Sequence, residues 1–169
     1  MTSAAHTTPS SSDASTGAQA PATGTRRVAA IDCGTNSIRL LVADVDVEAG
    51  TLTDLVREME VVRLGQGVDK TGRLAPEALE RTLEATRRYA QTCRELGAER
   101  VRFVATSASR DAENRQDFVD GVLAAIGVEP EVISGDEEAE LSFRGATSVL
   151  GTGHTAPYLV VDLGGGSTE

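Results

Sequence analysis

A short pattern occurs twice in this chain of 169 residues, first at residues 30–37 and again at residues 160–168. Each copy is an apolar stretch that ends in an aspartate, Asp32 or Asp162, followed by one residue, glycine and hydroxyl side chains. The two aspartates are 130 residues apart, about the size of one domain. Strands that end in glycine turns are common, so coincidence is the alternative. We interpret the pattern as the first strands of two similar domains, the second of which is cut short.

The residues of the two turns favour phosphate binding. Glycines let the backbone approach a ligand, and consecutive N–H groups can form a concave site for an anion. Hydroxyl and amide side chains add donors, at Thr35, Asn36, Ser37, Ser167 and Thr168. An aspartate repels a bare phosphate, so a divalent cation or an attacking water is expected between Asp32 or Asp162 and the ligand.

Composition excludes several other classes of protein. The formal net charge is −10, and the chain has three Phe, two Tyr and no Trp, whereas nucleic-acid binding needs basic grooves and stacking rings. No apolar run reaches the roughly 18 residues of a membrane span. Two cysteines cannot form a disulfide scaffold, and the N-terminus does not resemble a secretory signal. We therefore expect a cytoplasmic protein that binds neither nucleic acid nor membrane.

The chain divides into three parts. Residues 1–25 are rich in Ala, Ser, Thr, Pro and Gly, which is typical of a disordered tail. Residues 26–156 predict a domain with the order βββ-α-β-α-β-α, which is a mixed sheet covered by helices in the α/β class. Residues 157–169 predict an apolar strand and its glycine turn. The expected strands are 27–33, 38–47, 52–64, 101–106 and 131–133, and the expected helices are 76–97, 113–126 and 136–150.

Two helices have predicted inward faces. On the first helix, a stripe with helical spacing comprises Leu79, Leu83, Thr86, Ala90 and Cys93. On the second, the inward residues are expected to be Phe118, Val119, Val122, Leu123 and Ile126.

Four acidic residues begin the helix predicted at 136–150. Three have ordinary explanations, as a first-turn acid, a capping-box residue and the i,i+4 partner of an arginine: Asp136, Glu137 and Glu140. Glu138 has no such partner and lies at the edge of the face expected to be buried, which is formed by Ala139, Phe143, Ala146 and Leu150. Glu138 is therefore placed to meet a ligand or a water, although a solvated acid in a first turn is the simpler alternative.

Arg110 is a second candidate. It follows Thr106, Ser107 and Ser109 at the carboxyl end of a predicted strand, which is where open α/β sheets place their sites. Its guanidinium could clamp a phosphate, or it could pair at the surface with Asp111 or Glu113.

Several segments together resemble the exopolyphosphatase / guanosine pentaphosphate phosphohydrolase family. From about residue 26 to residue 169 they run in family order: IDCGTNSIRLLVADV, RLGQGVDKTGRL, EALERTLEATRRYA, VATSASRDAENRQDF, EVISGDEEAELSFRG and LVVDLGGGSTE. The resemblance implies a ribonuclease H-like domain of the actin-like ATPase superfold. It also implies hydrolysis of the terminal phosphoanhydride of inorganic polyphosphate, or of the 5′ phosphate of guanosine pentaphosphate, with Mg²⁺ as cofactor.

The resemblance also implies roles for individual residues. Glu138 would be the general base, Arg110 would bind phosphate, and Asp162 and Glu169 would hold the metal and the water. The two phosphate loops would consist of Asp32, Gly34, Thr35, Asn36 and Ser37, and of Gly164, Gly165, Gly166, Ser167 and Thr168. Two residues depart from the family pattern, since Cys33 replaces an aliphatic residue and Thr35 replaces serine. A homodimer is a candidate assembly of the full-length protein.

Two other functions are compatible with these residues. A sugar or acetate kinase of the same superfold would use the same two phosphate loops, but the acidic motif beginning at Ser134 favours a hydrolase. A binding or regulatory module for polyphosphate or guanosine alarmones would not need a general base.

We predict that the 169 residues on their own have little or no hydrolase activity. One wall of the expected cleft would be missing, so water would not be excluded from the phosphates. The measurement is phosphate release from polyphosphate by the purified chain. A rate comparable to that of a full-length relative would contradict the prediction.

Overall fold

A computed structural model describes residues 21–22, 24–148, 150 and 155–169. Most of the predicted disordered tail, at residues 1–20 and 23, lies outside the described residues. The first strand already begins at Thr25, so the ordered domain starts within one residue of the expected boundary.

The N-terminal half of the domain is the expected antiparallel meander. Its strands are β1 (Thr25–Cys33), β2 (Ser37–Asp46) and β3 (Thr51–Val61). β2 pairs antiparallel with both β1 and β3. Each connection between these strands has only a few residues, and connections this short favour neighbouring antiparallel strands.

Helices and parallel strands then alternate. The remaining elements are α1 (Val68–Thr71), α2 (Pro76–Glu95), β4 (Arg100–Ala105), α3 (Ser107–Arg110), α4 (Arg115–Ile126), β5 (Glu131–Val132) and α5 (Gly135–Thr147). The short helices α1 and α3 lie in segments expected to be loops. The other elements confirm the predicted order, with boundaries that differ by a few residues.

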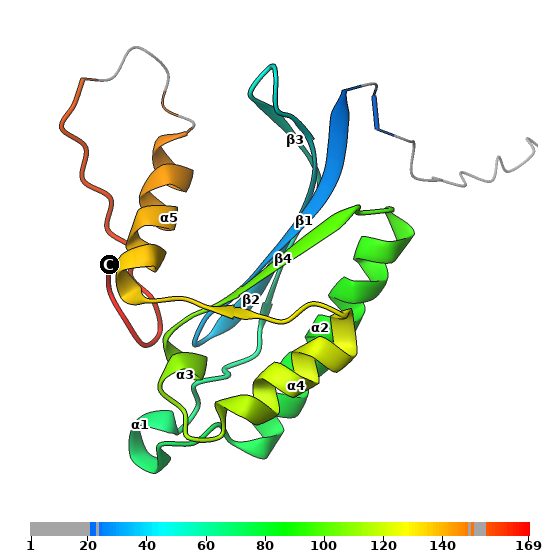
Figure 1. Ribbon diagram of the computed structural model, residues 1–169. Helices are drawn as coiled ribbons and strands as arrows, with labels where there is room; N and C mark the ends of the chain where they lie inside the picture. Colours follow the sequence, from blue (N-terminus) through cyan, green and yellow to red (C-terminus); the bar gives the residue numbers. More distant parts are fainter. Residues whose placement is uncertain (1–20, 23, 149, 151–154) are drawn as a thin grey trace, which may run out of the picture.

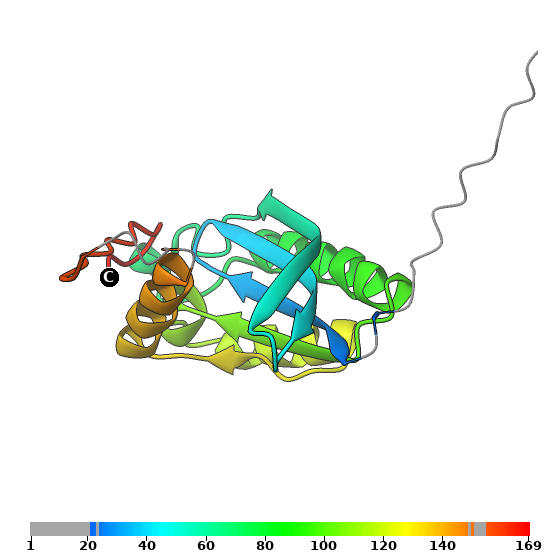
Figure 2. The same ribbon diagram turned by 90° about the horizontal axis from the view of Figure 1, so that it is seen from above.

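The five strands form one mixed sheet in the order β3-β2-β1-β4-β5 (Figure 1). β1 is central, and it pairs in parallel with β4, which pairs in parallel with β5. α2 and α4 contact each other and lie on one side of the sheet, whereas α5 lies on the other (Figures 1 and 2). This is the mixed α/β fold expected of a ribonuclease H-like domain.

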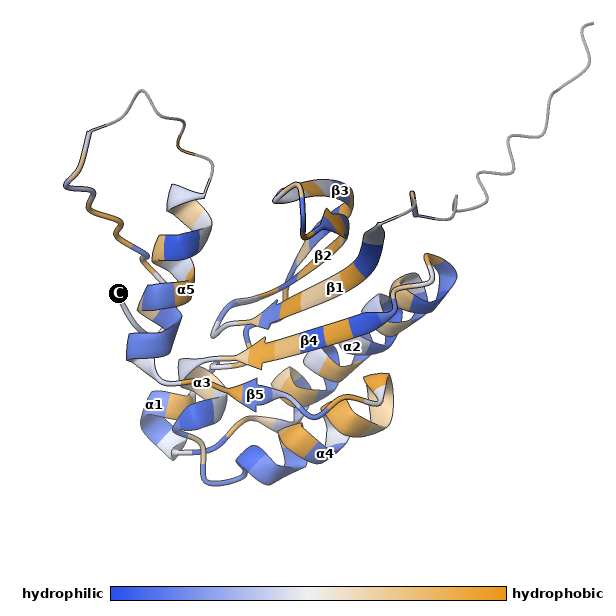
Figure 3. Ribbon diagram, turned by 45° about the horizontal axis from the view of Figure 1, so that its top comes forward, coloured by the Kyte–Doolittle hydropathy of each residue, from blue (hydrophilic) through white to orange (hydrophobic). Residues whose placement is uncertain are grey.

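The hydrophobic core lies between the sheet and the helix pair α2 and α4 (Figure 3). Of the stripe predicted on α2, Leu83, Thr86, Ala90 and Cys93 are buried and Leu79 is partly buried. On α4, Phe118 and Val122 are buried, and the Phe118 ring meets Phe103 of β4 edge to face. Leu123 is 45% exposed, so the prediction that it points inward was wrong.

The buried face predicted on α5 is also wrong. None of the described side chains of α5 is buried, and Phe143 is 42% exposed. The helix has the predicted spacing and the predicted Ser134 cap on the Glu137 N–H. Periodicity defines the apolar face of a helix, but burial requires a neighbouring element to cover that face.

The apolar segment at 157–169 does not form the predicted strand. In the described residues from 155 onward the backbone makes an isolated antiparallel bridge, Leu163 with Thr168, and Leu163 is 80% exposed. A strand needs a hydrogen-bonded neighbour, and this segment pairs with itself instead. The proposal that it begins a second domain therefore remains a prediction.

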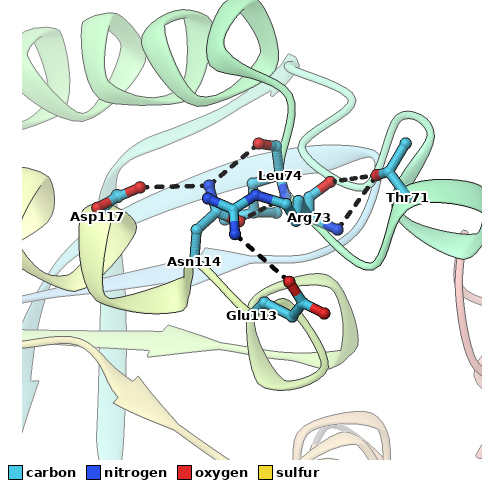
Figure 4. A network of polar contacts seen from close by, with 6 residues as sticks. All are labelled: Thr71, Arg73, Leu74, Glu113, Asn114 and Asp117. Atoms are coloured by element: carbon cyan, nitrogen blue, oxygen red, sulfur yellow. Dashed lines mark hydrogen bonds and ion pairs between the residues drawn. The ribbon is translucent and has the colours of Figure 1, made fainter.

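Asn114 connects the loop before α2 with the loop before α4. Its amide oxygen accepts from the Leu74 N–H (2.8 Å) and its amide nitrogen donates to the Leu74 carbonyl (3.2 Å) (Figure 4). Asn114 is the N-cap residue of α4, yet its side chain makes no cap hydrogen bond. An ion pair between Arg73 and Glu113 lies beside this contact. The segment before α2 is thereby fastened to the segment that joins α3 and α4.

We expect Asn114→Ala to destabilise the fold by about 1–3 kcal/mol, because it leaves both backbone groups of Leu74 without partners in a partly buried position. The measurement is the free energy of unfolding in urea. Gln116→Ala is the matched control, since Gln116 makes an exposed side-chain hydrogen bond on the same helix and its loss should cost little. Equal effects of the two substitutions would contradict the assigned role.

Candidate functional site

The parallel pairing of β1 and β4 brings the first loop beside the segment after β4. Cys33 is opposite Ala105 in the register, and the Thr106 N–H donates to the Cys33 carbonyl (3.2 Å). Two residues beyond each strand end, the Thr35 and Ser107 hydroxyls lie 2.8 Å apart. Hydroxyl donors from both strand ends therefore meet at one edge of the sheet.

The repeat seen in the sequence is also a repeat of backbone geometry. The Gly34 N–H donates to the Ser37 carbonyl (2.9 Å), and the Gly164 N–H donates to the Ser167 carbonyl (3.0 Å). The antiparallel pair that flanks each turn matches as well: Cys33 with Ile38, and Leu163 with Thr168. Both glycine turns are thus the same hairpin tip at a constant offset of 130 residues.

The two loops lie against each other. A Cβ atom added at Gly165 would be 2.7 Å from the Asn36 side-chain amide, and one added at Gly166 would be 2.6 Å from the Thr35 hydroxyl oxygen. Side-chain carbons do not approach other atoms so closely, so these two positions require glycine. The glycines of the second loop serve this close approach, since neither has a positive φ.

A cavity of about 880 Å³ lies next to the loops, between the open face of the sheet and α5. Ten of the predicted site residues line it: Asp32, Gly34, Thr35, Asn36, Ser37, Glu138, Asp162, Gly164, Gly165 and Ser167. Four others lie outside this lining: Arg110, Gly166, Thr168 and Glu169. These residues come from three separate segments, far apart in the sequence, that are brought to one cavity.

Glu138 is a partly buried carboxylate at this cavity. Its side chain is 18% exposed, and its Oε2 atom is buried without a hydrogen-bond partner among the described residues. Burial raises the pKa of Glu138, and the negative charge of Glu169 raises it further, while a hydrogen bond from Thr106 and the charge of Arg110 oppose the shift. A buried carboxylate oxygen without a hydrogen bond is costly unless a ligand, water or cation uses it.

Arg110 lies close to Glu138. Its Nη1 atom donates to the Ile133 carbonyl (2.9 Å) and lies 4.0 Å from the Glu138 Oε2 atom. The Arg110 Nε atom lies 3.6 Å from the Asp111 carboxylate, which was the surface pairing weighed against phosphate binding. The arginine therefore joins the end of β5 to the helix that carries Glu138.

The other predicted acids meet at a second, smaller cavity. Asp162 and Glu169 form two backbone hydrogen bonds with each other and line a cavity of about 380 Å³ beside α5. The Ser142 hydroxyl donates to the Asp162 carboxylate. Glu169 Oε2 is buried and lacks a partner among the described residues. Across the described part of the chain, no group of three or more His, Cys, Asp or Glu side chains is assembled as a metal site.

Sequence reasoning missed two contributors to this site. Ser142 lies one helical turn after Glu138, where the i,i+4 spacing predicts a small residue on the same track, but the sequence does not indicate that its hydroxyl donates to Asp162. Gly65 lies in a segment expected to be a plain polar loop, but its N–H donates to the Thr35 carbonyl (2.9 Å). No local pattern in the sequence indicates that second contact.

The fold is a mixed α/β domain, and comparison with known proteins places it in a family. The sequence profile of the Ppx/GppA phosphatase family matches residues 41–169, which is more than half of the chain. The chain belongs to the Ppx/GppA phosphatase family.

Individual relatives agree with this placement. Exopolyphosphatase 2 of Mycobacterium tuberculosis is 60% identical over 150 residues, which are 85% of this chain and 47% of the relative. The crystal structure of an exopolyphosphatase-like protein is 56% identical with a TM-score of 0.81, over 86% of this chain and 44% of that one. An Aquifex aeolicus PPX-GPPA enzyme is 35% identical with a TM-score of 0.73, over 85% of this chain and 47% of that one. The chain thus spans about half the length of these relatives. Among the described helices, none is long and apolar enough to cross a membrane.

We expect Glu138→Gln to stabilise the fold at neutral pH by about 1 kcal/mol, because it removes a charge that burial and the negative charge of Glu169 disfavour. The pKa of Glu138 is higher in the folded chain than the ordinary 4.5. The wild type therefore loses stability as the pH rises from 4.5 through the folded pKa. The gain in the free energy of unfolding from Glu138→Gln should be absent below pH 4.5 and should reach its full size above the pKa of Glu138 in the folded chain.

The measurement is the free energy of unfolding of both proteins between pH 4 and pH 8. Glu140→Gln is the matched control on the same helix, since Glu140 is exposed and paired with Arg144. A Glu138→Gln variant that is less stable than the wild type at pH 7 would show that the carboxylate has a stabilising partner.

Proposed function

We propose that this site hydrolyses the terminal phosphoanhydride bond of inorganic polyphosphate or of guanosine pentaphosphate. The observation that carries the proposal is the buried, unpaired oxygen of Glu138 beside two matched glycine loops. The loops supply backbone and hydroxyl donors for phosphate oxygens. The Glu138 Oε2 atom, which has no hydrogen-bond partner among the described residues, is available to a water molecule. The family and its exopolyphosphatase members support the same reaction.

In this proposal Glu138 acts as the general base. It takes a proton from a water whose oxygen bonds to the terminal phosphorus while the bridging P–O bond breaks. The products are inorganic phosphate and a chain shorter by one phosphate. The raised pKa of Glu138 makes it a stronger base than an exposed glutamate, because proton abstraction improves as the pKa approaches the working pH.

Arg110 and the two loops would hold the phosphates. The guanidinium of Arg110 lies near Glu138, so a terminal phosphate bound by Arg110 would lie beside the base. Donors on the other side would come from Thr35, Asn36, Ser37, Ser167 and Thr168. A phosphoryl group held between such donors is stabilised as negative charge develops in the transition state.

The acidic residues fit a divalent cation such as Mg²⁺. The net charge of the chain is −10, which repels a polyanion. Within the described ranges, Glu138 and Glu169 each have a buried oxygen without a hydrogen-bond partner, and hard cations prefer oxygen ligands of this kind. Asp162 and Glu169 would hold the ion, and phosphate oxygens and waters would complete its shell, as Mg²⁺ usually retains several waters. When bound, the ion would neutralise phosphate charge.

A hybrid protein tests the proposal. Residues 1–169 replace the corresponding part of Mycobacterium tuberculosis exopolyphosphatase 2, and phosphate release is measured with polyphosphate and with guanosine pentaphosphate. Glu138→Gln should lower kcat by about 10²–10⁴-fold with little change in KM, because it removes the base and keeps the shape of the site.

Glu140→Gln is the matched control and should leave kcat unchanged, since Glu140 pairs with Arg144 on the outer side of the same helix. Normal turnover by the Glu138→Gln hybrid would show that Glu138 is not the base. A wild-type hybrid that binds either substrate without releasing phosphate would favour a binding module.

A further inference from the structure

Thr35 of the first loop is enclosed by two glycines that come from different parts of the chain. Gly166 of the second loop lies against its hydroxyl oxygen, and Gly65 lies against its methyl group. A Cβ added at Gly65 would be 2.4 Å from Thr35 Cγ2 and 3.3 Å from Ala108 Cβ. No positive φ occurs at Gly65, so the space it leaves, and not its backbone conformation, is what the Thr35 side chain requires.

The backbone around Gly65 cannot move away without cost. The Gly65 N–H donates to the Thr35 carbonyl (2.9 Å), and the N–H groups of Val62 and Arg63 both donate to the Asn36 carbonyl (2.9 and 2.8 Å). Arg63 itself has a φ of 51°, a left-handed conformation that is uncommon for a residue other than glycine. Three hydrogen bonds therefore hold residues 62–65 against the first loop at a constant distance.

A side chain at residue 65 would have to be accommodated by rotation of Thr35. Threonine is β-branched and has few χ1 rotamers. The present rotamer places the methyl at Gly65 and the hydroxyl 2.8 Å from Ser107 Oγ. Rotation that takes the methyl away from residue 65 also takes the hydroxyl away from Ser107.

We propose that Gly65 is a positioning residue for the first phosphate loop: its bare backbone sets the rotamer of Thr35 and so aims the Thr35 hydroxyl at Ser107 and the cavity. The effect on phosphate binding rests on the proposed function. The effect on the Thr35 rotamer does not, because it depends only on packing. Gly65 would matter less beside a serine at position 35, because serine lacks the methyl group.

Rescue by serine tests the proposal. In the 169-residue chain, Gly65→Ala should shift the NMR signals of the residue 34–37 amides and of Ser107, and it should reduce the hydrogen-exchange protection of the residue 65 amide. Thr35→Ser combined with Gly65→Ala should restore the pattern of Thr35→Ser alone, because the atom that clashes is gone. Gly145→Ala is the control for the substitution itself, since a Cβ there meets nothing within 4 Å.

Gly166→Ala provides a second control with the opposite expectation. The Cβ added there meets the Thr35 oxygen at 2.6 Å, and serine keeps that oxygen, so Thr35→Ser should not rescue it. If Gly65→Ala leaves the loop signals unchanged, or if serine rescues both glycine variants equally, the assigned role of Gly65 is wrong.

Kinetics in the hybrid connect this packing to phosphate. Gly65→Ala should lower kcat/KM for polyphosphate by about 10–100-fold. The kcat/KM of the double variant should return to within about threefold of that of Thr35→Ser, because the effects of substitutions at two contacting residues are not additive and the clash is absent when residue 35 is serine. A hybrid without any turnover would contradict the proposed function, while the NMR rescue would still decide the role of Gly65. Normal NMR rescue without kinetic rescue would overturn the link between Thr35 and the phosphate site.

Discussion

The parallel register between β1 and β4 is the constraint on which the rest of the site depends. With Cys33 opposite Ala105, both strands end at the same level of the sheet, and the residues that follow them meet. The Thr35 and Ser107 hydroxyls are then 2.8 Å apart although 72 residues separate them. A shift of one residue in this pairing would turn each side chain to the opposite face and would separate the two hydroxyls.

Glycine has two different functions around this junction. In the turns before and after helices, glycines such as Gly72 and Gly127 adopt positive φ values that other residues avoid. At Gly65, Gly165 and Gly166 the backbone is ordinary, and what matters is the absence of a side chain where two segments touch. The site is thus built by close approach of three backbone segments, and hydroxyl and amide groups fill the space between them.

The polar groups of the core and those near the loops differ in whether they have hydrogen-bond partners. The core between the sheet and the helices α2 and α4 satisfies its polar groups, as in the buried contact of Arg27 with Asp44 and the Leu96 carbonyl. Near the loops, Glu138 and Glu169 each keep a buried oxygen without a hydrogen-bond partner in the part of the chain that the structure describes. A fold that leaves such groups unpaired loses stability at these positions, and residues of this kind are concentrated at functional sites.

Much of the fold could be predicted because the relevant interactions are local. Pro76 and the stripe on α2 define a helix, and the turn residues between the first three strands define a meander. The failures concern surfaces that another element has to cover. Phe143 and Leu163 are apolar and correctly spaced, yet they are exposed. Burial depends on neighbours that are distant in the sequence, and spacing along one element contains no information about those neighbours.

The sequence by itself determined the two matching glycine turns, their offset of 130 residues and the candidate carboxylate Glu138, because each depends on residues within a few positions of one another. Only the tertiary structure decided which groups meet: Thr35 with Ser107, Gly65 with the Thr35 methyl, and Glu138 with Arg110 and the charge of Glu169. The physical reason is that desolvation, pKa and steric fit are set by the atoms packed around a group. Here those atoms come from segments separated by tens of residues, which a local pattern does not describe.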